Sequence, residues 1–118
     1  MESIDKKRIR KINGESKVVS TSIFWIKKQL KTSNRLKVID ENIGEFEFNG
    51  NMLKVYCPVT TEYEINVDVL LKASDKGANI ITYPTSWCEA TVEAISQSKS
   101  YGIEIMPFGK FLGIYGEQ

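Results

Sequence analysis

The residues best suited to chemistry are two glutamates and a lysine that lie close together in the sequence, Glu45, Glu47 and Lys54. Carboxylate oxygens are the ligands that hard divalent metals prefer, and a nearby lysine can orient or activate water beside a scissile phosphate. These three are therefore candidate catalytic residues, to which Glu62 or Glu64 could add a ligand if the chain folds back. The alternative is structural, a cross-strand ion pair between Glu45 and Lys54 worth about 0.2–1 kcal/mol.

None of the 118 residues is a histidine, which limits the kinds of catalytic and metal site that the chain can form. This absence excludes Ser-His-Asp and Cys-His nucleophiles, His-ligated metals and a histidine pH switch. No P-loop motif is present either. Cys57 and Cys88 are too few for a metal site by themselves, so we expect reduced, packed thiols. No small-molecule cofactor is evident, and a carboxylate-bound Mg²⁺ is the leading option if the protein is an enzyme.

The catalytic candidates fall on a segment that is typical of a β-hairpin. Asn49-Gly50 stands between two segments of alternating polarity, which indicates a two-residue type I′ turn. That turn fixes the register and sets Glu45 opposite Lys54, with Glu47 on the same face. The opposite face, which we expect to be buried, carries four apolar residues: Phe46, Phe48, Leu53 and Val55.

Around this hairpin, apolar spacing, capping residues and glycines predict an alternation of helices and strands. In chain order we expect a helix from residue 20 or 21 to about 31, a strand over 36–39, the hairpin, a helix over 67–76 capped by Asn66, a strand over 78–83, a helix from Ser86 to about Tyr101, a strand over 103–106, and a turn with a short strand or helical turn over 108–115. The predicted fold class is α/β, a single domain. We expect a central mixed sheet of four to five strands, the hairpin followed by βαβ-type crossovers, and helices on both faces.

The net charge of +1 hides a basic beginning and an acidic remainder. Residues 1–37 carry eleven basic and three acidic residues, a net charge of +8, whereas residues 38–118 have a net charge of −7. Such asymmetry favours a surface that binds a polyanion, DNA or RNA. The alternative is that the basic part packs against the acidic part of the same chain or of a second copy, as in a homodimer. The expected nucleic-acid-binding residues are Arg8, Arg10, Lys27, Lys28, Lys31 and Arg35.

The chain divides into a basic N-terminal arm over residues 1–19, with a short helical piece, and an α/β domain over residues 20–118. No apolar stretch reaches the roughly 18 residues of a membrane span, and the start does not resemble a secretory signal. We therefore expect a soluble cytoplasmic protein with no membrane partner. Four aromatic residues are expected to be exposed, where they could stack on unpaired bases or form core edges or dimer contacts: Tyr56, Tyr63, Tyr83 and Trp87.

The order of elements and several small-residue patterns resemble the PD-(D/E)xK, or restriction-endonuclease-like, nucleases, and in particular their Mrr-type branch. The stretch from Gly77 to Ser86, GANIITYPTS, is similar to the strand "GA-x-x-I-I-T-T-S" of that branch. An alanine-containing helix follows, and then Gly102-Ile103-Glu104-Ile105 and Phe108-Gly109. The resemblance covers roughly residues 20–115 and implies a restriction-endonuclease-like domain.

The resemblance also implies where a catalytic motif would stand, with an acid on the first hairpin strand and an acid-x-lysine on the second. Glu45 or Glu47 fits the first position, but Tyr56 and Pro58 occupy the acid and lysine positions of the second. We therefore expect a nucleic-acid-binding protein on a catalytically degenerate nuclease-like scaffold. The alternatives are a Mg²⁺- or Mn²⁺-dependent endonuclease with a rearranged site, and a non-enzymatic protein-interaction or regulatory module.

Overall fold

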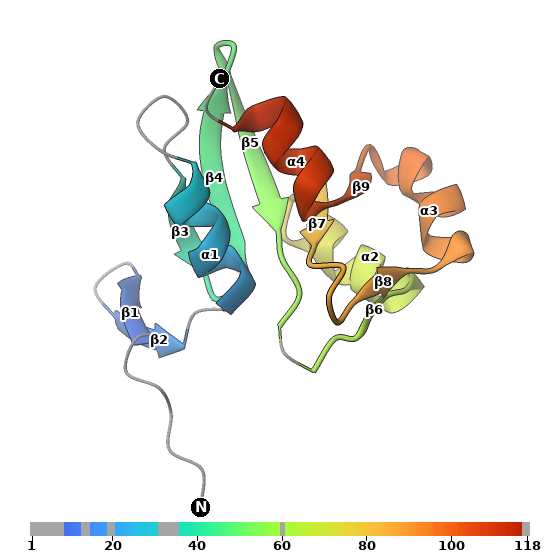
Figure 1. Cartoon of the computed structure of the whole chain (residues 1–118), viewed down its shortest axis with the longest axis horizontal. Coiled ribbons are helices and arrows are strands. Elements are labelled where there is room, and N and C mark those ends of the chain that lie inside the picture. Colours follow the sequence, from blue (N-terminus) through green and yellow to red (C-terminus); the bar gives the residue numbers. More distant parts are fainter. Residues whose placement is uncertain (1–8, 13–14, 19–20, 31–35, 60, 117–118) are drawn as a thin grey trace, which may run out of the picture.

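The computed structural model describes residues 9–12, 15–18, 21–30, 36–59 and 61–116 (Figure 1). Helices and strands alternate after an initial pair of strands. The elements are β1 (Ile9–Ile12), β2 (Glu15–Val18), α1 (Thr21–Gln29), β3 (Lys37–Asp40), β4 (Ile43–Phe48), β5 (Asn51–Tyr56), β6 (Glu64–Ile65), α2 (Val67–Asp75), β7 (Ile80–Tyr83), β8 (Glu89–Ala90), α3 (Val92–Ser98), the 3₁₀ turn η2 (Lys99–Tyr101), β9 (Glu104–Pro107) and α4 (Phe108–Tyr115).

A five-stranded mixed sheet in the order β3-β4-β5-β7-β9 forms the centre of the molecule. The first three strands are antiparallel neighbours, whereas β5, β7 and β9 are parallel. Helices α1 and α4 cover one face of the sheet, and α2 and α3 lie on the other (Figure 1). This arrangement confirms the predicted α/β fold class, because helical crossovers join strands that run in the same direction.

The hairpin of β4 and β5 has the predicted turn and register. Asn49 and Gly50 have φ angles of 52° and 80°, as a type I′ turn requires. Glu45 is the cross-strand partner of Lys54, and Phe46 is the partner of Leu53. The apolar face packs into the first core, so the predicted division of the hairpin into two faces is confirmed.

Two hydrophobic cores lie on the two faces of the sheet. The first packs α1 and α4 against the sheet and includes Ile23, Phe46 and Phe111, while the second packs α2 against it and includes Tyr56 and Leu70. The parallel strand β7 supplies neighbouring residues to both cores, because a strand covered on both faces buries successive side chains. The two free cysteines are both buried, which confirms the prediction of packed thiols.

The last element is a full helix, not the predicted turn with a short strand or single helical turn. Two of the eight residues of α4 are glycines, which disfavour a helix intrinsically. The apolar residues, however, stand at the i, i+3, i+4 and i+7 positions of one helical face, and this face packs on the first core. Tertiary burial therefore outweighs the local propensity. The residues of this face are Phe108, Phe111, Leu112 and Tyr115.

The predicted helix from Ser86 to Tyr101 begins six residues later than expected, at Val92. Its N-cap is Thr91, whose side chain accepts a hydrogen bond of 3.1 Å from the backbone N–H of Ala94. The residues before the cap form β8, which pairs in parallel with β6. The helix start predicted from the capping-box pattern at Ser86 was wrong, because Glu89 and Ala90 form a strand that pairs with β6, a segment distant in the sequence.

The N-terminal segment contains two paired strands where a short helical piece was expected. β1 and β2 are antiparallel, with Ile9 opposite Val18 and Arg10 opposite Lys17. The division between an arm over residues 1–19 and a domain over residues 20–118 stays a prediction. Within the described residues, no helix has the length and apolar character needed to cross a membrane.

Candidate functional site

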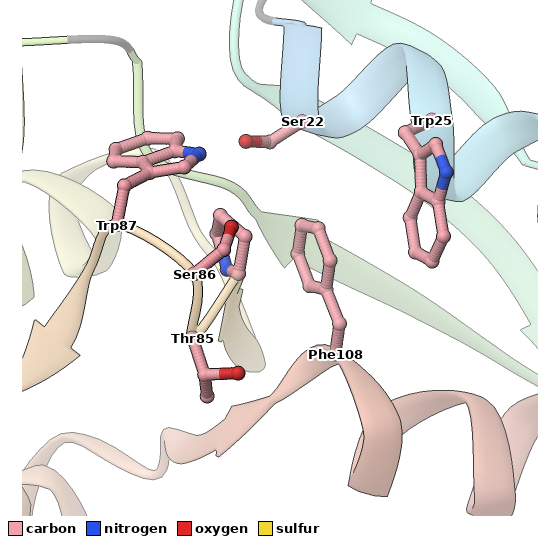
Figure 2. Close-up of a pocket in the computed structure, with 7 residues that line it drawn as sticks. Ser22, Trp25, Thr85, Ser86, Trp87 and Phe108 are labelled. Atoms are coloured by element: carbon pink, nitrogen blue, oxygen red, sulfur yellow. The ribbon is translucent and has the colours of Figure 1, made fainter.

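The carboxyl ends of the parallel strands β5, β7 and β9 meet at one edge of the sheet, which is where open α/β sheets usually bind ligands. A cavity of about 460 Å³ lies beside the ends of β7 and β9 (Figure 2). We call it the Ser22 cavity. It is lined by Ser22 and Trp25 of α1, by Pro84, Thr85, Ser86 and Trp87 of the segment after β7, and by Phe108 at the start of α4.

The walls of the Ser22 cavity are largely aromatic. Trp25 and Phe108 are stacked, with ring centroids 5.1 Å apart and an interplanar angle of 10°. Trp87 stands on the opposite side of Phe108 from Trp25 (Figure 2). The chain has two tryptophans, and both line this cavity. Aromatic walls of this kind suit a flat ring, which can stack against them.

Ser22 gives the cavity a buried polar group. The residue is only 5% exposed, and its hydroxyl has no hydrogen-bond partner among the described residues. Figure 2 shows this hydroxyl directed into the space between Phe108 and Trp87. The Ser22 side chain lines the cavity, so its hydroxyl is placed to form a hydrogen bond with a ligand atom there.

Two helices begin beside the cavity. Ser22 is the second residue of α1, and Phe108 is the first residue of α4. The N-cap of α4 is Pro107, which makes no side-chain capping hydrogen bond. The first N–H groups of a helix have no partner within the helix and carry a partial positive charge, so helix N-termini attract anions. None of the seven lining residues is acidic.

No protein-family model, curated protein or solved structure matches this chain. Its function is therefore inferred from its own residues.

The candidate catalytic residues share a face of the hairpin but do not form a described site. Glu47 is exposed, while Glu45 and Lys54 are partly buried. The Lys54 side chain extends over the end of α2, where its Nζ would be 3.6 Å from a Cβ at Gly77. No ion pair between Glu45 and Lys54 is present within the described part of the chain. None of these three residues lines the Ser22 cavity or three further cavities of the described part of the chain.

A metal centre on these glutamates likewise lacks support. No group of three or more histidine, cysteine, aspartate or glutamate side chains in the described residues could hold a metal ion. Glu64 belongs to β6, where its cross-strand partner is Glu89. The catalytic assignment of Glu45, Glu47 and Lys54 stays a prediction.

Glu62 is held in a hydrogen-bond cluster of its own. Its carboxylate accepts hydrogen bonds from the Tyr56 hydroxyl (2.9 Å to each oxygen) and from the Val59 backbone N–H (3.0 Å), and it pairs with Lys72 at 2.5 Å. Tyr56 is fully buried, so its predicted exposure was wrong. Burial and the neighbouring Glu62 raise the pKa of Tyr56, so the phenol stays a protonated donor at neutral pH. The cluster anchors the segment after β5.

Replacement of Glu62 by alanine is expected to destabilise the protein by about 1–3 kcal/mol, because the buried Tyr56 hydroxyl loses its acceptor. Urea unfolding would measure this loss. Tyr56→Phe should recover part of it in the double variant, since no unsatisfied hydroxyl remains. Glu64→Ala, at an exposed position nearby, serves as the control and should change the unfolding free energy by less than about 0.5 kcal/mol. Equal effects of the two alanine variants would contradict the anchoring role.

The predicted nucleic-acid-binding residues divide between described and undescribed parts of the chain. Lys27 and Lys28 are exposed in the last turn of α1. Arg10 belongs to β1, and nothing is described of its side chain. The other three, Arg8, Lys31 and Arg35, lie outside the described residues.

Three of the expected aromatic residues gather around a second cavity of about 620 Å³. Tyr63, Tyr83 and Trp87 line it together with Glu64 and Glu89. The ring of Tyr63 meets Trp87 edge-on, with centroids 6.4 Å apart. Trp87 therefore stands between this second cavity and the Ser22 cavity.

The sequence reading missed Ser22, Trp25 and Phe108 as site residues. The sequence does contain a signal for Trp25, because this residue falls outside the helical face formed by Ile23, Ile26 and Leu30, which is the buried face of α1. A tryptophan on the exposed side of a short helix indicates a contact surface. Nothing in the local sequence marks Ser22 or Phe108.

Proposed function

We propose that this chain is a nucleic-acid-binding protein that receives an unpaired base in the Ser22 cavity. The observation that carries the proposal is the aromatic lining of this cavity at the carboxyl edge of the sheet. Stacking of a base on an aromatic side chain contributes about 1–3 kcal/mol and tolerates any base sequence. A cavity of about 460 Å³ is within the range of small-ligand sites and suits a single nucleotide.

The surface of α1 supports the same proposal. Lys28 is three residues beyond Trp25 and thus on the same side of the helix, and Lys27 is exposed next to it. A strand whose base occupies the cavity can run along α1, so that its phosphates approach these lysines. Each neutralised phosphate releases counterions, which makes the affinity depend on salt.

The arrangement of elements supports a nuclease-like scaffold for this function. A helix and strand precede the hairpin, and a helix, a strand, a helix and a strand follow it, as the resemblance implied. Of the two residues at the acid and lysine positions of the second hairpin strand, Tyr56 is engaged with Glu62 and Pro58 is buried. Binding is therefore favoured over cleavage, since the Ser22 cavity and three further cavities lined by described residues include none of the candidate catalytic residues.

Intrinsic tryptophan fluorescence tests the proposal directly, because both tryptophans line the cavity. Titration with oligothymidylate of about 12 nucleotides should quench the fluorescence to saturation. A duplex of the same length should bind more weakly, because its bases are already stacked. An RNA strand of the same length distinguishes DNA from RNA preference. Absence of any quenching or binding by the single strands at low salt would overturn the proposal and favour the protein-interaction alternative.

A salt titration on two lysine variants separates specific phosphate contacts from general charge. For single strands the slope of log affinity against log salt falls by about 0.7 for each lost phosphate contact. Lys27→Ala should lower the slope by about this amount. Lys99→Ala removes an exposed lysine of η2, far along the chain from α1, and should leave the slope unchanged.

A further inference from the structure

We infer that the Ser22 cavity binds the terminal phosphate of a nucleic-acid strand, with the first base stacked beside Phe108 and Trp87. This inference rests on the proposed function and names the part of the strand that the cavity takes. The ligand chemistry is a phosphate monoester attached to an unpaired nucleotide. Four features of the cavity lead to it: a hydroxyl that lines it, two helix N-termini, an aromatic wall and a volume suited to one nucleotide.

The Ser22 hydroxyl is the polar group of the cavity that a ligand can reach. It is directed into the cavity and has no hydrogen-bond partner within the described residues (Figure 2). It can therefore donate a hydrogen bond to an acceptor oxygen of a bound ligand. A phosphate monoester offers three such oxygens, and hydrogen bonds to charged oxygens are the stronger kind.

The helix ends explain why the acceptor should be an anion. α1 and α4 both begin at the cavity, so the partial positive charges of their first N–H groups act on the same space. The N-cap of α4 makes no side-chain hydrogen bond, so no capping side chain occupies its first N–H groups. None of the seven lining residues is acidic, so none of them repels a dianion.

The charge of the phosphate explains why it should be terminal. The segment after β7 and the starts of α1 and α4 line a space suited to one nucleotide (Figure 2). A terminal phosphate carries a charge of about −2 and three free oxygens, whereas a phosphate within a strand carries one charge and two free oxygens, so the helix N-termini and the Ser22 hydroxyl favour the terminal group. The base of that last nucleotide then meets Phe108 and Trp87, and the rest of the strand leaves toward the exposed side of α1.

Strands that differ only in their ends test the inference. Fluorescence titrations of the unaltered protein would compare oligothymidylates of one length with a 5′-phosphate, a 3′-phosphate or hydroxyls at both ends. Thymidine 5′-monophosphate tests whether a free nucleotide suffices. One phosphorylated end should bind about tenfold or more tightly than the hydroxyl-ended strand, the range expected for hydrogen bonds to a charged group.

Serine variants then locate the phosphate. Ser22→Ala should remove most of the preference for the phosphorylated end. Ser96→Ala, at an exposed position of α3, is the matched control and should alter neither affinity. Equal binding of phosphorylated and hydroxyl-ended strands would overturn the inference and leave the proposed function standing. If no strand binds, the proposed function fails with it.

Discussion

Replacement of Phe46 by alanine is expected to lower the free energy of unfolding by about 3–5 kcal/mol. Phe46 is 1% exposed at the centre of the first core. Its ring meets Phe111 edge-on at 5.8 Å and Tyr115 at 5.4 Å, and with Phe48, which is 4.8 Å from Tyr115, it holds α4 on the sheet. Alanine would leave a cavity where three aromatic rings meet. The loss is a large share of the roughly 5–15 kcal/mol that stabilises a typical domain.

Chemical denaturation of Phe46→Ala measures this effect, with two further variants for comparison. Phe46→Leu keeps most of the apolar volume but loses the edge-to-face contacts, which are worth about 0.5–1.5 kcal/mol each, so its loss should be smaller. Met52→Ala lies on the hairpin with a side chain 57% exposed and should cost less than about 0.5 kcal/mol. If Phe46→Ala is no more harmful than Met52→Ala, the packing of α4 against β4 is incorrect.

The consequence of this packing extends to the candidate site. α4 begins with Phe108, so the aromatic contacts at its far end fix the direction in which it enters the Ser22 cavity. A partially denatured Phe46 variant would therefore lose base stacking along with stability. Phe46→Leu, which should remain folded, separates the two effects.

The hairpin could be predicted residue by residue because its information is local. Asn49-Gly50 requires two positive φ angles, and a two-residue turn leaves only one register, so both faces follow from the sequence. The helix over 67–75 could be predicted from local sequence equally well. Asn66 caps it, and Gly77 follows it with a φ of 77°.

Elements whose limits depend on distant partners could not be predicted in this way. α3 begins at Val92 because β8 pairs with β6, more than twenty residues earlier in the chain. α4 is helical because its apolar face packs on the sheet despite its glycines. The buried face of α2 also depends on the fold, since Leu71 is 40% exposed while Val69 and Ala73 are buried.

The candidate site was the part of the structure that the sequence predicted least well. The predicted hairpin register placed Glu45 opposite Lys54 correctly. Residues that share one face of a hairpin do not, however, have to line a cavity. The Ser22 cavity is assembled from α1, the segment after β7 and the start of α4, which are separated by about sixty and about twenty residues. Only the fold brings these segments to one edge of the sheet, and no motif or residue spacing in the sequence predicts that they meet.

Replacement of Trp87 by alanine is expected to weaken the binding of single-stranded oligothymidylate by about tenfold or more, because the stacking of one base is lost. Trp87 forms the wall of the Ser22 cavity that faces Phe108 (Figure 2). Trp87→Phe keeps a smaller ring in the same place and should retain part of the affinity. Trp25 stays in both variants and reports binding by its fluorescence.

The decisive control comes from the opposite side of Trp87. Tyr63 is 65% exposed, contacts the edge of Trp87 and lines the second cavity but not the Ser22 cavity. If Trp87 acts by stacking on a base in the Ser22 cavity, Tyr63→Ala should leave the affinity within about twofold of the unaltered protein, as substitutions outside a binding centre usually do. An equal loss in Tyr63→Ala and Trp87→Ala would move the binding site to the second cavity. There the carboxylates of Glu64 and Glu89 would repel phosphates, so such a result would argue against a nucleic acid as the ligand.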